Sequence, residues 1–157
     1  MDAGAVARSR ALVSRDVAPS SKPLLVQPQH SFSSPPHVLI VDDDEDSLII
    51  YERFLGLAGY ETSRARSGTE ALRRVRSEAP AAVLLDLVLP DMHGSELVML
   101  LRATPGLEHI PIVGITARVT PDLLTDPESV PVPRLLLKPT SSGELLDAIR
   151  ESLEAVT

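Results

Sequence analysis

The 157-residue sequence contains no cysteine, which excludes disulfides, thiolate metal sites and thiol nucleophiles. Aromatic residues make up only 3% of the chain, so its core must be built from Leu, Val, Ile and Ala. No apolar run approaches the roughly 18 residues of a membrane span, and the N-terminus lacks the apolar segment of a signal peptide. The net charge of −7 disfavours a nucleic-acid surface. We therefore expect a soluble, cytoplasmic protein that contacts neither membranes nor nucleic acids directly.

The first 36 residues show no periodic pattern. Five prolines interrupt them, and Ser, Ala and Gln fill the gaps, a composition that does not support a packed core. We predict a disordered tail over residues 1–36 and one folded domain over residues 37–155, which is long enough to bury a sizeable core.

Short apolar runs alternate with helix-forming segments in the rest of the chain. Strands are expected at residues 38–41, 60–65, 81–86, 111–116 and 134–137. Helices are expected at residues 47–58, 69–78, 95–103 and 141–154. Strands and helices that alternate at this spacing indicate βαβ units, and therefore an α/β fold with a parallel sheet.

A further helix between the last two strands is the weakest of these expectations. Four prolines in residues 121–133 leave room for only one or two turns, at residues 120–125. We predict that this helix, the fourth in the series, is short or irregular.

Polar side chains stand at the ends of four predicted strands. They are Asp42 and Asp43 after the first strand, Asp86 on the third, Thr116 on the fourth and Lys138 after the fifth. In a right-handed parallel sheet these ends lie on one edge, which is where open α/β sheets bind ligands.

This set of side chains suits phosphate chemistry. Clustered carboxylates repel one another unless a cation compensates, and oxygen ligands without Cys or His favour a hard cation, above all Mg²⁺. The ammonium of Lys138 suits an added phosphate, and the hydroxyl of Thr116 can donate to a phosphoryl oxygen. The pattern predicts metal-assisted transfer of phosphate onto a carboxylate, with Asp86 as the nucleophile.

Each residue taken alone also has an ordinary interpretation. The acidic run at residues 42–46 could be a solvated loop or the start of a helix, and Asp86 could cap the turn that follows it. Thr116 could be a simple strand-end hydroxyl, and Lys138 an ordinary loop residue. Their joint occurrence at strand ends favours the functional interpretation.

Four motifs match one protein family in order and separation. They are VLIVDDDED at the first strand, VLLDLVLPDMHG around Asp86, IVGITAR at the fourth strand and LLLKP at the fifth. From about residue 37 to residue 153, the chain resembles a response-regulator receiver domain of two-component signalling. The resemblance implies a flavodoxin-like, doubly wound five-stranded sheet with strand order 2-1-3-4-5.

The resemblance also implies a phosphoacceptor and a metal site. Asp86 would accept phosphate from the phosphohistidine of a sensor histidine kinase or phosphotransfer protein, and a downstream protein would read the result. Asp43, Asp86 and the backbone carbonyl of Val88 would bind Mg²⁺ directly. Asp42 would contribute through water.

The same resemblance assigns two residues to the added phosphate. Lys138 would hold the phosphoryl group, and Thr116 would move to hydrogen-bond it. In the family, an aromatic residue three positions before the lysine usually rotates inward as the threonine moves. Leu135 stands at that position here, and residues 121–133 replace the usual amphipathic helix. We therefore expect phosphorylation combined with an unusual or rigid output surface.

Two further positions bear on the lifetime of the phosphoryl group. Val88 and Arg118 flank the expected path of the hydrolytic water, where an apolar and a long side chain would shield the acyl phosphate. We expect slow self-dephosphorylation. The chain would be a phosphoacceptor regulator, not an enzyme in the classical sense.

Two other functions compete with this one. A haloacid-dehalogenase-like phosphatase also phosphorylates an Asp at a strand end, but that family has a second Asp two residues later, where this chain has Val88. A pseudo-receiver would bind a partner without being phosphorylated. Leu135 and the proline-rich segment favour a pseudo-receiver, whereas the complete set of strand-end residues argues against it.

Overall fold

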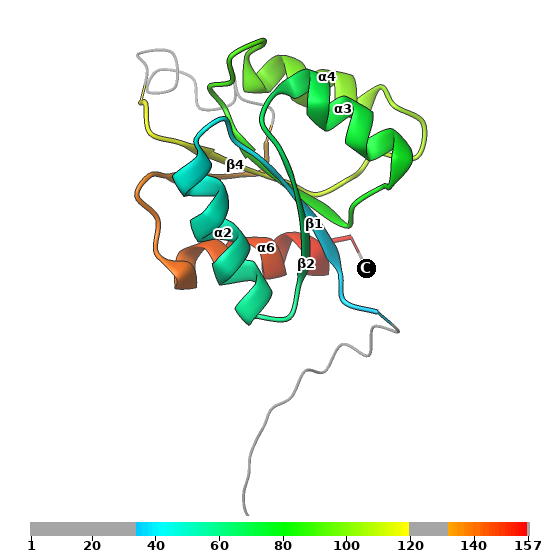
Figure 1. Cartoon of the computed structure of the whole chain (residues 1–157). Helices are drawn as coiled ribbons and strands as arrows, with labels where there is room; N and C mark the ends of the chain where they lie inside the picture. Colours follow the sequence, from blue (N-terminus) through cyan, green and yellow to red (C-terminus); the bar gives the residue numbers. More distant parts are fainter. Residues whose placement is uncertain (1–33, 120–131, 157) are drawn as a thin grey trace, which may run out of the picture. The chain divides into compact units, whose positions relative to one another are not determined.

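The computed structural model describes residues 34–119 and 132–156, which contain one five-stranded parallel sheet. The strand order is β2-β1-β3-β4-β5 (Figure 1). The strands are β1 His37–Val41, β2 Glu61–Ala65, β3 Ala82–Asp86, β4 Ile112–Thr116 and β5 Arg134–Leu137. The predicted fold class and strand order are confirmed.

Four helices lie within the described residues. They are α2 Glu45–Leu57, α3 Gly68–Ser77, α4 Gly94–Arg102 and α6 Ser142–Glu154. The short helix predicted at residues 120–125 lies outside the described residues, as does the predicted tail apart from residues 34–36. None of the helices in the described ranges is long and apolar enough to cross a membrane.

The central strands are buried on both faces because they are almost entirely apolar. In β1, Val38 and Ile40 belong to one side of the core, whereas Leu39 and Val41 belong to the other, as the alternation of side chains along a strand requires. Strand β2 is an edge strand, and its sequence ETSRA is correspondingly polar.

Helices α2 and α6 cover one face of the sheet, and α3 and α4 cover the other (Figure 1). Each helix buries one stripe of side chains, mostly three or four residues apart. The stripes are Leu48, Tyr51 and Leu55 in α2, Ala71 and Val75 in α3, Leu97, Val98 and Leu101 in α4, and Leu145, Ala148 and Ile149 in α6. Full burial of one Leu or Ile side chain contributes about 1.5–3 kcal/mol, so these stripes hold both layers on the sheet.

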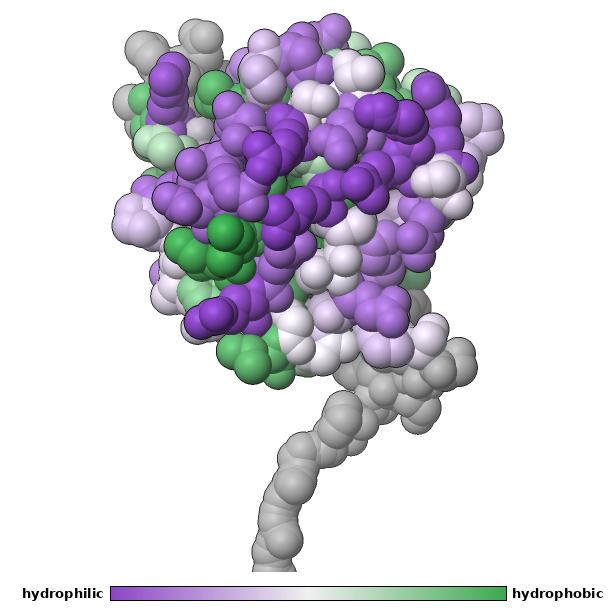
Figure 2. Space-filling model, in the orientation of Figure 1, coloured by the Kyte–Doolittle hydropathy of each residue, from purple (hydrophilic) through white to green (hydrophobic). Residues whose placement is uncertain are grey.

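The outer face of α2 is partly apolar. Ile49 and Ile50 are each 46% exposed, and Leu57 is 84% exposed. Figure 2 shows hydrophobic atoms over this helix on a face that is otherwise largely hydrophilic. The helix therefore presents aliphatic side chains to solvent as well as to the core.

The start of α2 divides the acidic run at residues 42–46. Asp44 is the N-cap, and its carboxylate accepts hydrogen bonds from the Ser47 N–H at 3.0 Å and the Ser47 hydroxyl at 2.8 Å. Glu45 and Asp46 occupy the first turn, where negative charge is favourable. The helix therefore begins two residues earlier than predicted, and only the first two acids remain at the strand end.

The strand register brings the predicted polar residues to one edge of the sheet. Strands β1 and β3 are aligned so that Asp42 and Asp86 lie at the same level on neighbouring strands. Strands β4 and β5 are aligned so that the Lys138 N–H donates to the Thr116 carbonyl at 2.8 Å.

The loop at residues 87–94, between β3 and α4, is closed tightly at its base. The Gly94 N–H donates to the Leu87 carbonyl at 2.8 Å, and Val88 and His93 form an antiparallel bridge. A Cβ on Gly94 would lie 2.6 Å from the Leu87 Cα. The close approach of the two backbones therefore requires glycine at this position.

Replacement of Gly94 by alanine should lower the free energy of unfolding by about 1–3 kcal/mol, because the new Cβ would press on backbone rather than on a flexible side chain. Urea denaturation measures this change. The matched control is Gly56→Ala in α2, where an added Cβ meets no described atom within 4 Å. That control should stabilise the protein by about 0.5 kcal/mol through helix propensity. Equal effects of the two substitutions would contradict the close approach at Gly94.

Candidate functional site

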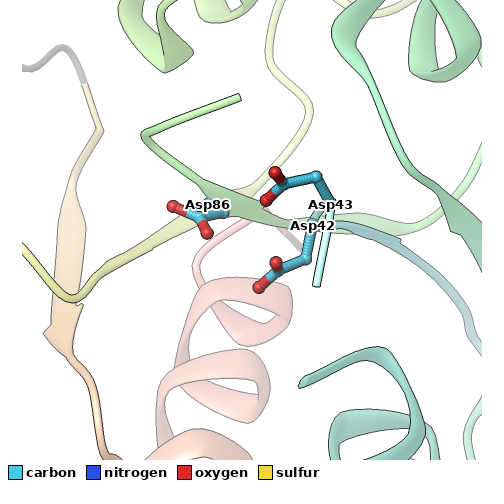
Figure 3. A group of neighbouring side chains, drawn as sticks. All are labelled: Asp42, Asp43 and Asp86. Carbon is cyan, nitrogen blue, oxygen red and sulfur yellow. The ribbon is translucent and has the colours of Figure 1, made fainter. Parts of the chain in front are cut away.

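Three carboxylates meet at the carboxyl edge of the sheet (Figure 3). Asp42 and Asp43 follow β1, Asp86 ends β3, and oxygen atoms of all three lie within 4.8 Å of one another. Asp42 is 1% exposed and Asp86 is 6% exposed, whereas Asp43 is exposed. Two of the three acids are thus removed from water, which is costly unless each has hydrogen-bonding partners.

Lys138 supplies the positive charge for the two buried acids. Its Nζ donates to Asp42 Oδ2 at 2.7 Å and to Asp86 Oδ2 at 3.0 Å. The other oxygen of Asp42 accepts the Asp44 N–H at 2.9 Å. The other oxygen of Asp86 accepts the Val88 N–H, also at 2.9 Å. Every oxygen of the two buried carboxylates therefore has a donor.

Burial and charge shift the pKa values of this cluster. Burial raises the pKa of Asp42 above its ordinary value and repulsion from Asp86 adds to this, although hydrogen bonds from Lys138 and Asp44 oppose the shift. Burial lowers the pKa of Lys138, but its bonds to the two acids and their charges outweigh burial, so that pKa is raised. The lysine therefore remains an ammonium at neutral pH.

The cluster fits a hard divalent cation. Three carboxylates and one ammonium give the cluster a formal charge of −2. The candidate ligand atoms of the three side chains are carboxylate oxygens, the type of ligand that Mg²⁺ prefers. Asp43 is exposed to solvent, so an ion can reach the cluster from outside.

A hollow of about 460 Å³ opens beside the acids. It is lined by Asp43, Asp44, Ser47, Asp86, Val88, Leu89, Pro90, Ala117, Arg118 and Lys138. Val88 and Arg118 thus lie close to Asp86, as the motif spacing suggests. Ser47 lies just outside the motif at the first strand, and Leu89 and Pro90 belong to the motif around Asp86 without an expected role of their own. All three reach the hollow because the first turn of α2 and the β3–α4 loop form its walls.

Thr116 lies at the same edge, but its hydroxyl is bonded to backbone. It accepts the Arg118 N–H at 3.1 Å and donates to the Arg118 carbonyl at 3.2 Å. Thr116 is 1% exposed and does not contribute to the lining of the hollow. Its hydroxyl is therefore satisfied by the turn that follows β4.

Comparison with known proteins identifies the family. The profile of the response regulator receiver domain matches residues 38–150. The chain belongs to this receiver family. The predicted family is confirmed, and so is the prediction that the chain is not an enzyme in the classical sense, since receiver domains are regulatory modules.

A named relative of this receiver is the polar-differentiation response regulator DivK of Brucella anthropi. The two sequences are 37% identical over 83 residues, which make up 53% of this chain and 68% of that protein. The receiver thus spans about two thirds of the length of this relative.

Two solved structures show the same fold as this receiver. A CheY-like response regulator receiver domain protein from Methanospirillum hungatei has a TM-score of 0.70 and 27% identity, over 78% of this chain and 96% of that one. The receiver domain of a sensor histidine kinase from Pseudomonas aeruginosa has a TM-score of 0.71 and 22% identity, over 77% and 99%. A magnesium ion is coordinated in the active-site cleft of the Pseudomonas domain.

In this receiver, Leu135 packs beside a glycine of the neighbouring strand. Leu135 is aligned with Gly114 of β4. A Cβ on Gly114 would lie 3.1 Å from Leu135 Cδ1 and 3.1 Å from Val132 Cγ2. Leu135 and Val132 therefore fill the space that a larger residue at position 114 would need. The resemblance in sequence draws attention to Leu135, but the contact with Gly114 follows only from the strand register.

Asp91 of the receiver is a well-bonded residue that sequence reasoning missed. Its carboxylate accepts the N–H groups of Gly68 and Thr69, both at 2.9 Å, and the Thr69 hydroxyl at 2.7 Å. These bonds, led by that of the hydroxyl, lower the pKa of Asp91 to about 2. After Pro90, an aspartate looks like an ordinary turn residue, and its nearest partner lies 22 residues earlier in the chain.

The stability difference between the unmodified receiver and Asp91→Asn should shrink as pH falls from about 5 to about 2. The pKa of Asp91 is depressed in the folded state, so its stabilising contribution is complete above about pH 4 and is lost as pH falls through about 2. Thermal unfolding of both proteins by circular dichroism across this range measures the difference. A constant difference would contradict the assignment of these bonds.

Proposed function

We propose that the chain is a phosphoacceptor signalling domain in which Asp86 receives a phosphoryl group from a phosphohistidine. The donor would be a sensor histidine kinase or a phosphotransfer protein. The environment of Asp86 carries this proposal, because its carboxylate shares Lys138 with Asp42 and lines an open hollow. Membership of the receiver family supports it.

The transfer exchanges one bond to phosphorus for another. A carboxylate oxygen of Asp86 attacks the phosphorus, and the P–N bond to the donor histidine breaks. The imidazole leaves with the bonding electron pair and takes up a proton, so the product is an acyl phosphate on Asp86. Because phosphoryl transfer leaves little covalent chemistry to the protein, the surrounding residues act through orientation and charge.

We assign the Mg²⁺ ligands as the carboxylates of Asp43 and Asp86 and the backbone carbonyl of Val88, with Asp42 acting through water. The close grouping of the acids and their excess negative charge support this assignment. When bound, the ion would neutralise charge on the transferred phosphoryl group. The magnesium in the cleft of the Pseudomonas receiver domain supports the choice of metal.

Lys138 and Thr116 are proposed to hold the added phosphoryl group. The ammonium has three N–H donors, and two of them now serve Asp42 and Asp86. Thr116 would release the backbone of Arg118 and donate its hydroxyl to a phosphoryl oxygen. Phosphorylation would then shift the turn that follows β4, because that turn loses two hydrogen bonds to the hydroxyl.

The signal is proposed to leave through contacts with a downstream protein in the cytoplasm, without direct contact to nucleic acid or membrane. The packing of Leu135 beside Gly114 supports an output surface that changes little at this position. The domain is proposed to span residues 37–155, with residues 1–36 as a disordered tail.

A binding module that is never phosphorylated is the second candidate. Two observations favour it. The Thr116 hydroxyl is bonded to the backbone of Arg118, and Leu135 occupies the position of the usual aromatic residue beside Gly114.

The full chain, incubated with Mg²⁺ and a small acyl-phosphate donor, should gain one phosphate in an intact-mass measurement. Asp86→Asn should gain none because it lacks the nucleophile, and removal of Mg²⁺ with EDTA should prevent the gain. Asp46→Asn, which alters an exposed acid in α2, should gain phosphate normally. An unmodified chain that gains no phosphate would support the binding module, and continuous hydrolysis of phosphate esters would support a phosphatase.

The phosphoryl group on Asp86 should persist for minutes or longer, because Val88 and Arg118 line the hollow beside it and hinder water. The double variant Val88→Ala, Arg118→Ala should shorten its half-life several-fold. Loss of phosphate with time, followed by intact mass, measures both proteins. A half-life of seconds in the unmodified chain would contradict the shielding.

A further inference from the structure

The β3–α4 loop, residues 87–94, forms one wall of the hollow beside Asp86. A hydrogen bond of 2.8 Å between its first and last residues closes its base. Its middle lines the hollow with Val88, Leu89 and Pro90. Its tip faces a different element, the N-terminus of α3.

Asp91 at the tip joins the loop to α3. Its carboxylate accepts the N–H groups of Gly68 and Thr69 and the Thr69 hydroxyl, at 2.9, 2.9 and 2.7 Å. A negative charge at a helix N-terminus is also favoured by the helix dipole. Met92, the next residue, occupies the space that a side chain on Gly68 would fill. Both hydrogen bonds and packing therefore attach the tip to the helix.

The helix also has a cap of its own. Ser67 is the N-cap of α3, and its hydroxyl accepts the Glu70 N–H at 3.1 Å. Ser67 and Asp91 thus satisfy different free amides of the first turn. The bond of Ser67 is local to the helix, whereas the bonds of Asp91 connect the helix to the wall of the site.

We infer that Asp91 is a positioning residue for the metal site, because its attachment to α3 fixes the backbone of the loop and with it the direction of the Val88 carbonyl. This inference rests on the proposed function, in which that carbonyl binds Mg²⁺. A backbone carbonyl has no side-chain torsion that could adjust its direction, so the loop alone sets it. Groups that orient metal ligands typically change metal affinity by about 10–100-fold.

Loss of Asp91 would also have two simpler effects, which need controls. The first effect is the loss of a negative charge. Its control is Glu96→Gln, which removes a negative charge from the first turn of α4, at the other end of the same loop. The second effect is a weaker start of α3. Its control is Ser67→Ala, which removes the N-cap hydrogen bond of α3 and leaves the hydrogen bonds of the loop unchanged. Thr69→Val removes only the hydroxyl donor to Asp91 and leaves every charge in place.

Mg²⁺ binding to the full chain, measured by isothermal titration calorimetry without a phosphate donor, tests the inference. Asp91→Asn should raise the Kd for Mg²⁺ about tenfold, because an amide keeps one acceptor oxygen where the carboxylate has two. Thr69→Val should raise it by a smaller factor. At physiological salt, where exposed charges are screened, Glu96→Gln and Ser67→Ala should each change it less than about twofold.

Hydrogen exchange provides a second measurement that needs no metal. In Asp91→Asn, the amides of Val88 and Gly94 should exchange faster than in the unmodified chain, because the loop has lost its attachment at the tip. In Ser67→Ala, the amide of Glu70 should exchange faster while those two stay protected. This pattern separates a released loop from a weakened helix.

An affinity of Asp91→Asn equal to that of the unmodified chain, of Glu96→Gln or of Ser67→Ala would overturn the positioning role. So would unchanged exchange at Val88. Failure of the proposed function is distinguishable, because a chain that binds Mg²⁺ in an Asp91-dependent way and takes no phosphate on Asp86 refutes only the phosphoacceptor function. A chain that binds no Mg²⁺ refutes both.

Discussion

The carboxyl edge of the sheet depends on the balance between two buried acids and one lysine. Asp42 and Asp86 lie side by side away from water, an arrangement that is strongly unfavourable without a cation and hydrogen-bond donors. Lys138 supplies the cation from β5, which is separated from β1 by two strands. Its ammonium therefore ties an edge of the sheet to the centre, and the acids stay buried only while the whole sheet is assembled.

The segments that line the hollow are held in place by contacts that lie outside it. Leu87 and Gly94 close the base of the β3–α4 loop by a close backbone approach, and Asp91 attaches the tip to α3. Asp44 serves both α2 and the site, since its side chain caps the helix and its N–H donates to Asp42. Secondary-structure capping and the orientation of the acids are thus maintained by the same few polar contacts.

Most of the fold could be predicted because it follows from local patterns. Apolar runs that stop at a polar residue indicate where the strands end. Because parallel strands end at a shared edge, the sequence also predicts that Asp42, Asp86 and Lys138 lie close together. Helix α2 begins two residues before its predicted start, because an acidic run does not reveal which Asp caps the helix. Asp91 was missed for a similar reason, since its partners belong to another element.

The α/β class and the polar groups at each strand end follow from the amino-acid sequence alone, because they depend on residue type and on spacing along the chain. The contacts of each polar group, in contrast, are visible only in the folded protein. The Thr116 hydroxyl is bonded to the backbone of Arg118, and Leu135 lies beside Gly114. The Asp91 carboxylate accepts a hydrogen bond from the first turn of α3. These contacts depend on strand register, on side-chain rotamers and on packing between distant segments. None of these factors produces a periodic pattern in the sequence.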